Sequence, residues 1–176
     1  MSPVRVTSAR QLVIVICVLG TIGCDHLTKH AATMTLAGSP PRSYLADTIR
    51  LGYAENAGGF LSVGASLPVV PRSAVFTVLP GLLLIGITAV AIYRRWGGTL
   101  ALGTALFVAG AASNWIDRLA RGIVVDFLNV GIGPVRTGIF NVADVAIVVG
   151  ALMFVYQEFR PGTSSEGPYT RSRDDA

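Results

Sequence analysis

The sequence is poor in charge for its length. Only 14% of its 176 residues are charged, whereas ordinary soluble domains carry about 25%. This deficit, with 52% hydrophobic residues and a mean hydropathy of +0.60, indicates an integral membrane protein. The arginines are scattered among apolar runs and form no basic stripe. The net charge of +4 therefore gives no reason to expect a nucleic-acid partner.

Cysteine is equally scarce. Cys17 and Cys24 would lie roughly 10 Å apart along a helix, and disulfides join Cα atoms less than about 7 Å apart, so we expect no disulfide. His26 and His30 have a spacing that can bind a metal, but they form no HExxH motif and have no third ligand nearby in the sequence. We expect neither a metal nor a cofactor.

The first apolar run allows two interpretations. Residues 11–24 have the length of a signal-peptide core and end in Cys24, as a lipoprotein signal does. Thr21, however, stands three positions before Cys24, where such a signal favours leucine, and further apolar runs follow. We therefore expect an uncleaved span over about 11–33 that includes Asp25.

The later apolar runs cover about 73–93, 99–118 and 139–159, and each approaches the 20 or so residues of a membrane helix. The sequence thus predicts an all-α polytopic membrane protein with four transmembrane helices in one domain, residues 1–160. The polar tail, 161–176, is expected to be a disordered cytoplasmic segment. Four spans place both termini on one side. Basic residues are divided evenly, but the Arg94-Arg95 pair in the shortest loop favours a cytoplasmic location for that side.

Polar residues interrupt the spans at the opposite face. The first and third spans end there, and the fourth begins there. The intruding residues are Asp25, Lys29, Asn114, Asp117, Arg118, Asn141 and Asp144. Ionisable groups at membrane depth are costly, so their convergence suggests a shared site. Structural alternatives exist: Asn141 and Asp144 as a helix cap, Asp117 with Arg118 as an interfacial ion pair, and Asp25 with Lys29 as a local pair.

Asp126 is harder to explain by structure alone, because it lies within the apolar stretch 123–128. A carboxylate in such surroundings needs a partner or has a raised pKa. Close to Asp144 it would form a dyad in which one member keeps its proton. One carboxylate would then activate a water while the other protonates the carbonyl oxygen or the leaving amine. The alternatives are a small transporter with proton-relay aspartates and an assembly factor whose charges only pair.

Four motifs resemble those of the bacterial lipoprotein signal peptidase family, also called signal peptidase II. They are DHLTK from Asp25, NAGG from Asn56, SNWIDRLARGIVVDF from Ser113 and FNVAD from Phe140. The resemblance implies a membrane aspartic endopeptidase of the bacterial cytoplasmic membrane. It would cleave diacylglyceryl-modified prolipoproteins just before the lipidated cysteine, at the outer face. Membrane lipid and globomycin-type inhibitors are further implied partners.

The resemblance also implies roles for individual residues. The catalytic aspartates fall on Asp126 and Asp144. The supporting and substrate-binding residues fall on Asp25, Asn56, Gly58, Asn114, Asp117, Arg118, Asn141 and Ala143. We add Lys29, because it interrupts the end of the first span at the same face.

The family further implies a small extracytoplasmic β-cradle and a short surface helix after the first span. The alternation of Ile49, Leu51 and Tyr53 with Arg50 and Gly52 independently predicts a half-buried strand there. One departure from the family pattern is that the aromatic Phe60 follows the NAGG motif one place early.

Overall fold

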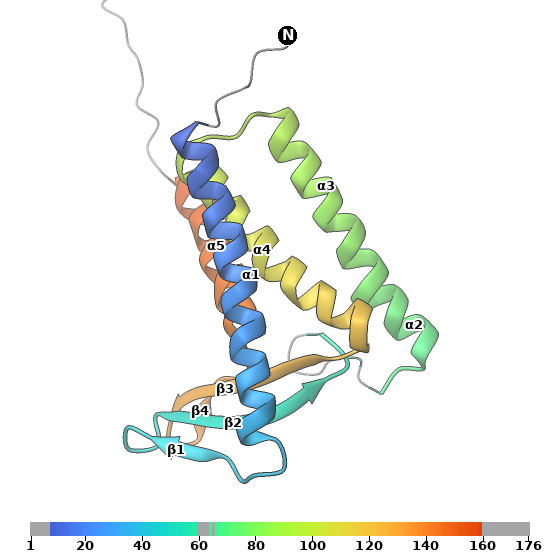
Figure 1. Ribbon diagram of the computed structural model, residues 1–176, viewed down its shortest axis with the longest axis vertical. Helices are drawn as coiled ribbons and strands as arrows, with labels where there is room; N and C mark the ends of the chain where they lie inside the picture. The colour runs from blue at the N-terminus through green and yellow to red at the C-terminus, as the bar shows by residue number, and fades with distance from the viewer. Residues whose placement is uncertain (1–7, 60–63, 65, 160–176) are drawn as a thin grey trace, which may run out of the picture.

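Long apolar helices form a bundle, and a small antiparallel sheet lies across one of its ends (Figure 1). The computed structural model describes residues 8–59, 64 and 66–159. Among these residues, three helices are long and apolar enough to cross a membrane: Ala9–Leu36 (α1), the composite helix Val69–Tyr93 and Gly98–Arg121 (α4). A fourth apolar helix, Val142–Phe159 (α5), is shorter. The predicted tail and Phe60 lie outside the described residues.

Helix α1 begins with a reciprocal cap. The Ser8 hydroxyl accepts a hydrogen bond from the Gln11 backbone, and the Gln11 side chain accepts one from the Ser8 backbone. In the same first turn, the Arg10 guanidinium donates to the carbonyl of Trp96, just before α4. Helices α1 and α4 therefore start at the same end of the bundle and run in the same direction (Figure 1).

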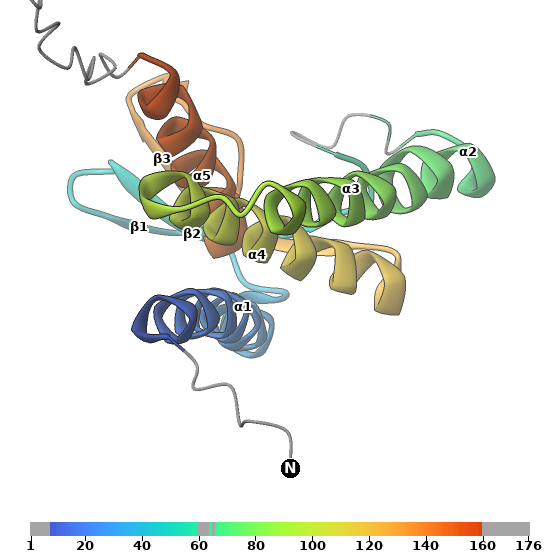
Figure 2. The ribbon, with the colours of Figure 1, turned by 90° about the horizontal axis from the view of Figure 1, so that it is seen from above.

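The composite helix has three segments: α2 (Val69–Ser73), a π-helical turn η2 (Ala74–Val78) and α3 (Leu79–Tyr93). Pro80 lacks a backbone N–H and cannot make the usual bond to the preceding turn, which explains the irregularity next to it. Because α2 continues directly into η2 and α3, it is not a separate surface helix, and the described residues contain no other short helix between β2 and α3. In the second view, α3 and α1 lie on opposite sides of α4 (Figure 2).

Small residues let α4 and α5 pack closely. A Cβ on Gly150 would lie 2.6 Å from the carbonyl oxygen of Gly103, and a Cβ on Gly110 would collide with the carbonyl of Ala143. Such small-residue contacts are typical of helix pairs in membranes. They bring the start of α5 against the part of α4 that carries Ser113 and Asn114.

Helix α5 starts at Val142, three residues later than the sequence suggested. Phe140 is held in extended conformation by hydrogen bonds with Leu128 in both directions, and Asn141 caps the helix. Residues 139–141, which hydropathy alone assigned to the span, therefore precede the helix, and Phe140 pairs with the sheet instead.

The sheet consists of Arg42–Tyr44 (β1), Ile49–Asn56 (β2), Val124–Ile132 (β3) and Val135–Arg136 (β4), in that order and antiparallel. It confirms the strand expected around Ile49–Tyr53. Its central pair sets Asn56 opposite Val124 and Ala54 opposite Asp126, with an irregularity between Leu51 and Ala54. This register brings the end of β2 alongside the start of β3, close to the ends of α1 and α4.

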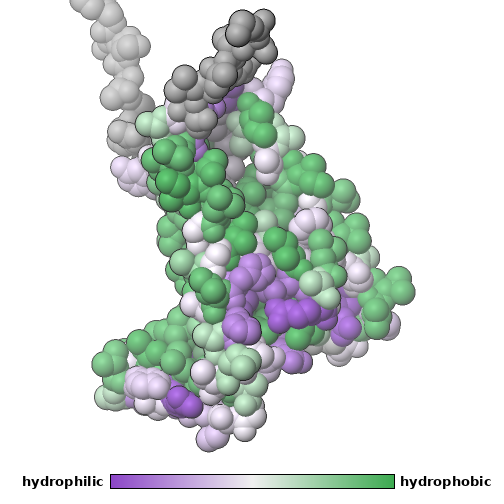
Figure 3. Space-filling view, in the orientation of Figure 1, coloured by the Kyte–Doolittle hydropathy of each residue, from purple (hydrophilic) through white to green (hydrophobic). Residues whose placement is uncertain are grey.

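The molecule is apolar outside and polar inside at one end. Large hydrophobic side chains such as Leu19, Leu83 and Leu152 are more than half exposed on the helix sides, as expected for a surface in contact with lipid. Polar and charged side chains are buried where the bundle meets the sheet. In the space-filling view, apolar colour covers the helices and polar colour gathers between the helices and the sheet (Figure 3).

Candidate active site

Asp126 is the third residue of β3 and follows two fully buried valines, Val124 and Val125. Its own side chain is 4% exposed. Asn56 Nδ2 donates to Oδ2 at 3.0 Å and Asn141 Nδ2 donates to Oδ1 at 2.7 Å. Burial raises the pKa of Asp126 to about 6, the nearby Asp144 adds to the increase, and the two amide hydrogen bonds oppose it. Asp126 is therefore a carboxyl group that holds its proton up to mildly acidic pH.

Asp144 lies in the first turn of α5 and forms a reciprocal cap with Asn141. Asn141 Oδ1 accepts from the Asp144 backbone at 3.0 Å, and the Asn141 backbone donates to Asp144 Oδ2 at 3.1 Å. Asn114 Nδ2 donates to the other carboxylate oxygen at 2.9 Å. The helix cap, one of the alternatives that the sequence left open, is thus confirmed, and it is part of the same cluster as Asp126.

Asn141 joins the two aspartates. It is fully buried, and it donates to Asp126 through its side chain and to Asp144 through its backbone. The two carboxyl groups are therefore both within hydrogen-bonding reach of one residue. Two carboxyl groups in such an arrangement can divide the roles of acid and base between them.

Lys29 supplies a buried positive charge to the polar cluster around Asp126 and Asp144. Its side chain is 2% exposed, and its ammonium group donates to Asn114 Oδ1 and Asp117 Oδ2, each at 2.7 Å, and pairs with Asp25 Oδ2 at 2.5 Å. All three of its donors are thereby used. The local Asp25–Lys29 pair is confirmed, but Lys29 also connects α1 to α4.

Asp25 connects α1 to both other helices of the site. It is fully buried and accepts from the Ser113 hydroxyl of α4 at 2.7 Å and from the Ala143 backbone of α5 at 2.8 Å. The Ala143 contact uses a backbone N–H in the first turn of α5, where the helix has no internal acceptor for it. Asp25 therefore fixes the position of the helix start that carries Asp144.

The turn after β2 closes another side of the cluster. Asn56 Oδ1 accepts from the Gly58 backbone at 3.1 Å, and its Nδ2 donates to the Gly59 carbonyl at 3.0 Å. Arg118 reaches this turn from α4, donating to the Gly58 carbonyl at 2.8 Å. Its Nε is buried and has no hydrogen-bond partner among the described residues.

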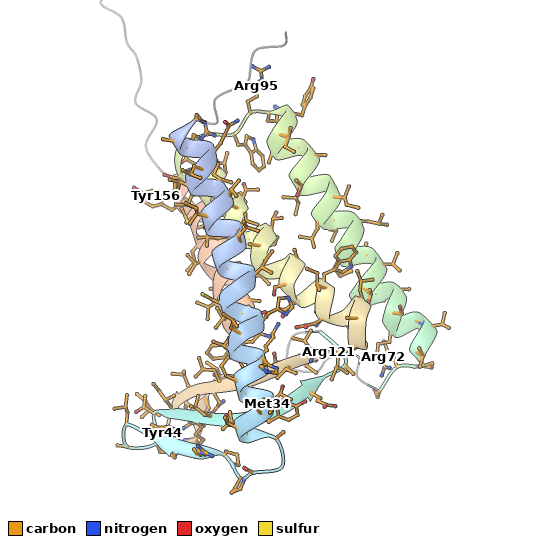
Figure 4. The ribbon with its side chains drawn as sticks, viewed as in Figure 1. Met34, Tyr44, Arg72, Arg95, Arg121 and Tyr156 are labelled. Atoms are coloured by element: carbon orange, nitrogen blue, oxygen red, sulfur yellow. The ribbon has the colours of Figure 1, made fainter. Side chains whose placement is uncertain are left out.

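The structure brings all the predicted site residues together at one end of the bundle. It differs from the expected Asp117–Arg118 pair, because Asp117 pairs with Lys29 and with Arg121, at 2.6 Å, while Arg118 bonds backbone carbonyls. Arg121 lies at this end, and Arg95 lies at the opposite one (Figure 4). Sequence reasoning missed Ser113 and Arg121, although both fall one helical turn from Asp117.

The two histidines lie outside the carboxylate pair. His26 Nδ1 is 3.8 Å from Asp117 Oδ1, and His30 is exposed. Within residues 8–59, 64 and 66–159, no group of three or more His, Cys, Asp or Glu side chains is placed to hold a metal ion.

The same chain segments match known proteins. The family model for signal peptidase II matches residues 16–160. A lipoprotein signal peptidase of Desulforapulum autotrophicum is 32% identical over 146 residues, which cover 80% of this chain and 89% of the relative. Another, of Rhodococcus jostii, is 32% identical over 159 residues and covers 87% and 75% of the two chains.

A solved bacterial membrane enzyme structure has the same fold. It superposes with a TM-score of 0.72 at 21% identity, covering 93% of this chain and 94% of its own. The family match spans most of the chain and includes every residue of the polar cluster. The protein therefore belongs to the signal peptidase II family.

Proposed function

We propose that this protein is an aspartic endopeptidase that removes the signal peptide from diacylglyceryl-modified prolipoproteins, cutting just before the lipidated cysteine. The observation that carries this proposal is the pair of contacts from Asn141 to Asp126 and Asp144. Membership of the signal peptidase II family supplies the substrate class. The burial of Asp126, with its raised pKa, supports a division of labour between the two carboxyl groups.

The reaction needs one proton shared by the pair. Asp144, as the base, takes a proton from a water molecule while that water attacks the scissile carbonyl carbon. Asp126, as the acid, gives its proton to the carbonyl oxygen, so a neutral tetrahedral diol forms. In the second step Asp144 protonates the leaving amine as the C–N bond breaks. Asp126 takes a proton back from the diol, which restores the starting state and releases a carboxyl group.

Supporting residues hold the two carboxyl groups and the substrate. Asn56, Asn114 and Asn141 orient the carboxylates through the hydrogen bonds described above. Arg118 keeps its Nε as a buried donor without a partner in the described residues. An unpaired buried donor carries a desolvation cost, and a substrate carbonyl would satisfy it.

The helix lengths and the distribution of arginines support a proposed membrane arrangement. We assign α1, the composite helix, α4 and α5 as four spans within residues 1–160, because α5 is 18 residues long, about 27 Å, close to the roughly 30 Å of the hydrocarbon core. The end with Arg94 and Arg95 faces the cytoplasm with both termini, which leaves the carboxyl pair and the sheet near the outer face of the bacterial cytoplasmic membrane. An apolar helix surface beside the site suits a lipid-modified substrate. Globomycin-type inhibitors are expected to bind at this site.

Replacing either aspartate with asparagine tests the dyad. Asp126→Asn and Asp144→Asn each remove one ionisable group with almost no change in volume. We expect each to lower kcat/KM by about 10²–10⁴-fold, the range of general acid–base catalysis, in an assay of a diacylglyceryl-modified prolipoprotein.

Asp47→Asn is the matched control, because Asp47 lies in the turn between β1 and β2 and forms ion pairs with Arg50 and Arg136, away from the carboxyl pair. It should cleave at nearly the wild-type rate. Normal cleavage by either Asn variant at the pair would refute the dyad. Equal cleavage of precursor without the lipid would refute the lipid dependence alone.

The pH–rate profile tests the shared proton. The pair loses that proton as pH rises through the raised pKa of Asp126, about 6, so kcat/KM should fall on the alkaline side with an apparent value that belongs to the pair. Asn56→Ala removes a hydrogen bond that favours the charged form of Asp126. It should therefore move this alkaline limb to higher pH. An unmoved limb would contradict the proton assignment.

The raised pKa of Asp126 also makes the stability of the fold depend on pH. The native state binds the Asp126 proton more tightly than the unfolded chain does, because the folded pKa is the higher one. Its contribution to the free energy of unfolding is present below the ordinary pKa of about 4 and is lost as pH rises to about 6.

Two ion pairs of equal length allow a comparison of burial. Lys29–Asp25 and Arg50–Asp47 are both 2.5 Å long, but the first pair is 2% and 0% exposed and the second 43% and 42%. Lys29→Met would leave the buried Asp25 carboxylate without its cation, although Asp117 would keep Arg121. Leaving a buried charge unpaired in this way typically costs about 3–5 kcal/mol. We expect a loss of that size in the free energy of unfolding measured in mild detergent, with loss of cleavage. Arg50→Met, the exposed control, should have little effect on the free energy of unfolding. If the two variants lost similar amounts of stability, burial of the Lys29 ion pair would not be what makes it important.

A further inference from the structure

The composite helix α2–η2–α3 is joined to the site by two aromatic side chains that the proposed mechanism does not use. Its main neighbour is α4, and the end that carries α2 lies far from α1 in both ribbon views (Figures 1 and 2). This end needs specific contacts to hold it at a fixed distance from the carboxyl pair.

Trp115 provides the first contact. It follows Asn114 on α4, and its indole Nε1 donates to the carbonyl of Thr77 at 2.8 Å. Thr77 belongs to the π-helical turn. The indole also lies against Gly81, where an added Cβ would be 2.8 Å from the ring. Trp115 therefore fixes the irregular turn on α4 through both a hydrogen bond and close packing.

Phe76 provides the second contact from the same π-helical turn. Its ring lies between two glycines: a Cβ on Gly59 would be 2.5 Å from Cε1, and a Cβ on Gly64 would collide with Cε2 on the other edge. Gly64 has φ +79°, which favours glycine independently. Gly59 and Gly64 are thus both packed against the Phe76 ring, without room for a side chain.

This contact acts on the turn that carries Asn56. Asn56 Nδ2 donates both to the Gly59 carbonyl and to Asp126 Oδ2, each at 3.0 Å. The Gly58 carbonyl in the same turn accepts from Arg118. A displacement of Gly59 would therefore change the hydrogen bond to the carboxyl group of Asp126.

We infer that Phe76 and Trp115 are positioning residues for the cleavage reaction: Trp115 fixes the π-helical turn on α4, and Phe76 holds the Asn56–Gly59 turn against Asp126. Neither side chain touches the reacting atoms. The inference rests on the proposed catalytic role of Asp126. It gives the composite helix, which has no role in the proposed mechanism, the role of holding the Asn56–Gly59 turn in place.

The test is a double-variant cycle read by the pH profile. Phe76→Ala should lower kcat/KM by about tenfold, the effect of weakening one hydrogen bond to a charged group, and move the alkaline limb to higher pH, as Asn56→Ala does. When Phe76→Ala is combined with Asn56→Ala, kcat/KM should fall no further than with Asn56→Ala alone, because both changes act on the same hydrogen bond to Asp126. Phe76→Leu, which keeps part of the bulk, should restore part of the rate.

Matched controls come from the aromatic cluster near the other end of the bundle, where the ring centroids of Phe154 and Trp96 are 6.2 Å apart. Phe154→Ala should leave the alkaline limb in place. Trp115→Phe keeps a ring but removes the donor, and it should shift the limb in the same direction as Phe76→Ala, whereas Trp96→Phe should not. If Phe76→Ala fails to fold, the two tryptophan variants decide the question.

The possible failures can be told apart. Full activity of Asp126→Asn would remove the catalytic proposal itself. An inactive Asp126→Asn together with losses that multiply in the Phe76–Asn56 cycle, or an alkaline limb that stays in place, would overturn the positioning role and leave the dyad intact.

Discussion

The buried side chain of Asn141 is the constraint on which the site depends. It caps α5, donates to Asp126 on β3 and donates to Asn114 on α4. One amide thus fixes a strand and two helices relative to each other. Since Asp126 lies in the sheet and Asp144 in a helix, their separation depends on how these elements are joined. Asp25 reinforces the joint by holding the Ala143 backbone.

Helix direction explains why so many polar groups meet at one level. Asp25 and Asn114 each lie about 24 Å along α1 and α4 from the helix starts, at 1.5 Å per residue, and both helices start at the same end of the bundle. Lys29 follows one turn after Asp25 and meets Asn114 and Asp117. Close packing through Gly103, Gly110 and Gly150 then sets α5 directly against α4. A polar interior of this kind is costly unless its charges are paired, and here Lys29 pairs with two of the carboxylates.

Much of this could be predicted from the sequence. Apolar run lengths indicated the helices, and the position of polar residues at the run ends indicated a common face. The spacing of Asn141 and Asp144 indicated the cap as one interpretation. Other features could not be predicted, because they depend on tertiary contacts. Phe140 looks like part of a span but pairs with Leu128 in the sheet. Asp117 stands next to Arg118, yet its side chain faces Lys29 and Arg121. The reach of Asn56 to Asp126 depends on the register of β2 with β3, which hydropathy does not encode.

In the proposed mechanism Asp126 and Asp144 share one proton. Infrared spectroscopy during a pH titration measures this directly, because a protonated carboxyl group absorbs apart from a carboxylate. We expect a buried carboxyl band that is lost as pH rises through about 6, is missing in Asp126→Asn and persists in Asp47→Asn. A titration with no such band, or a band unchanged in Asp126→Asn, would show that the two aspartates do not share a proton.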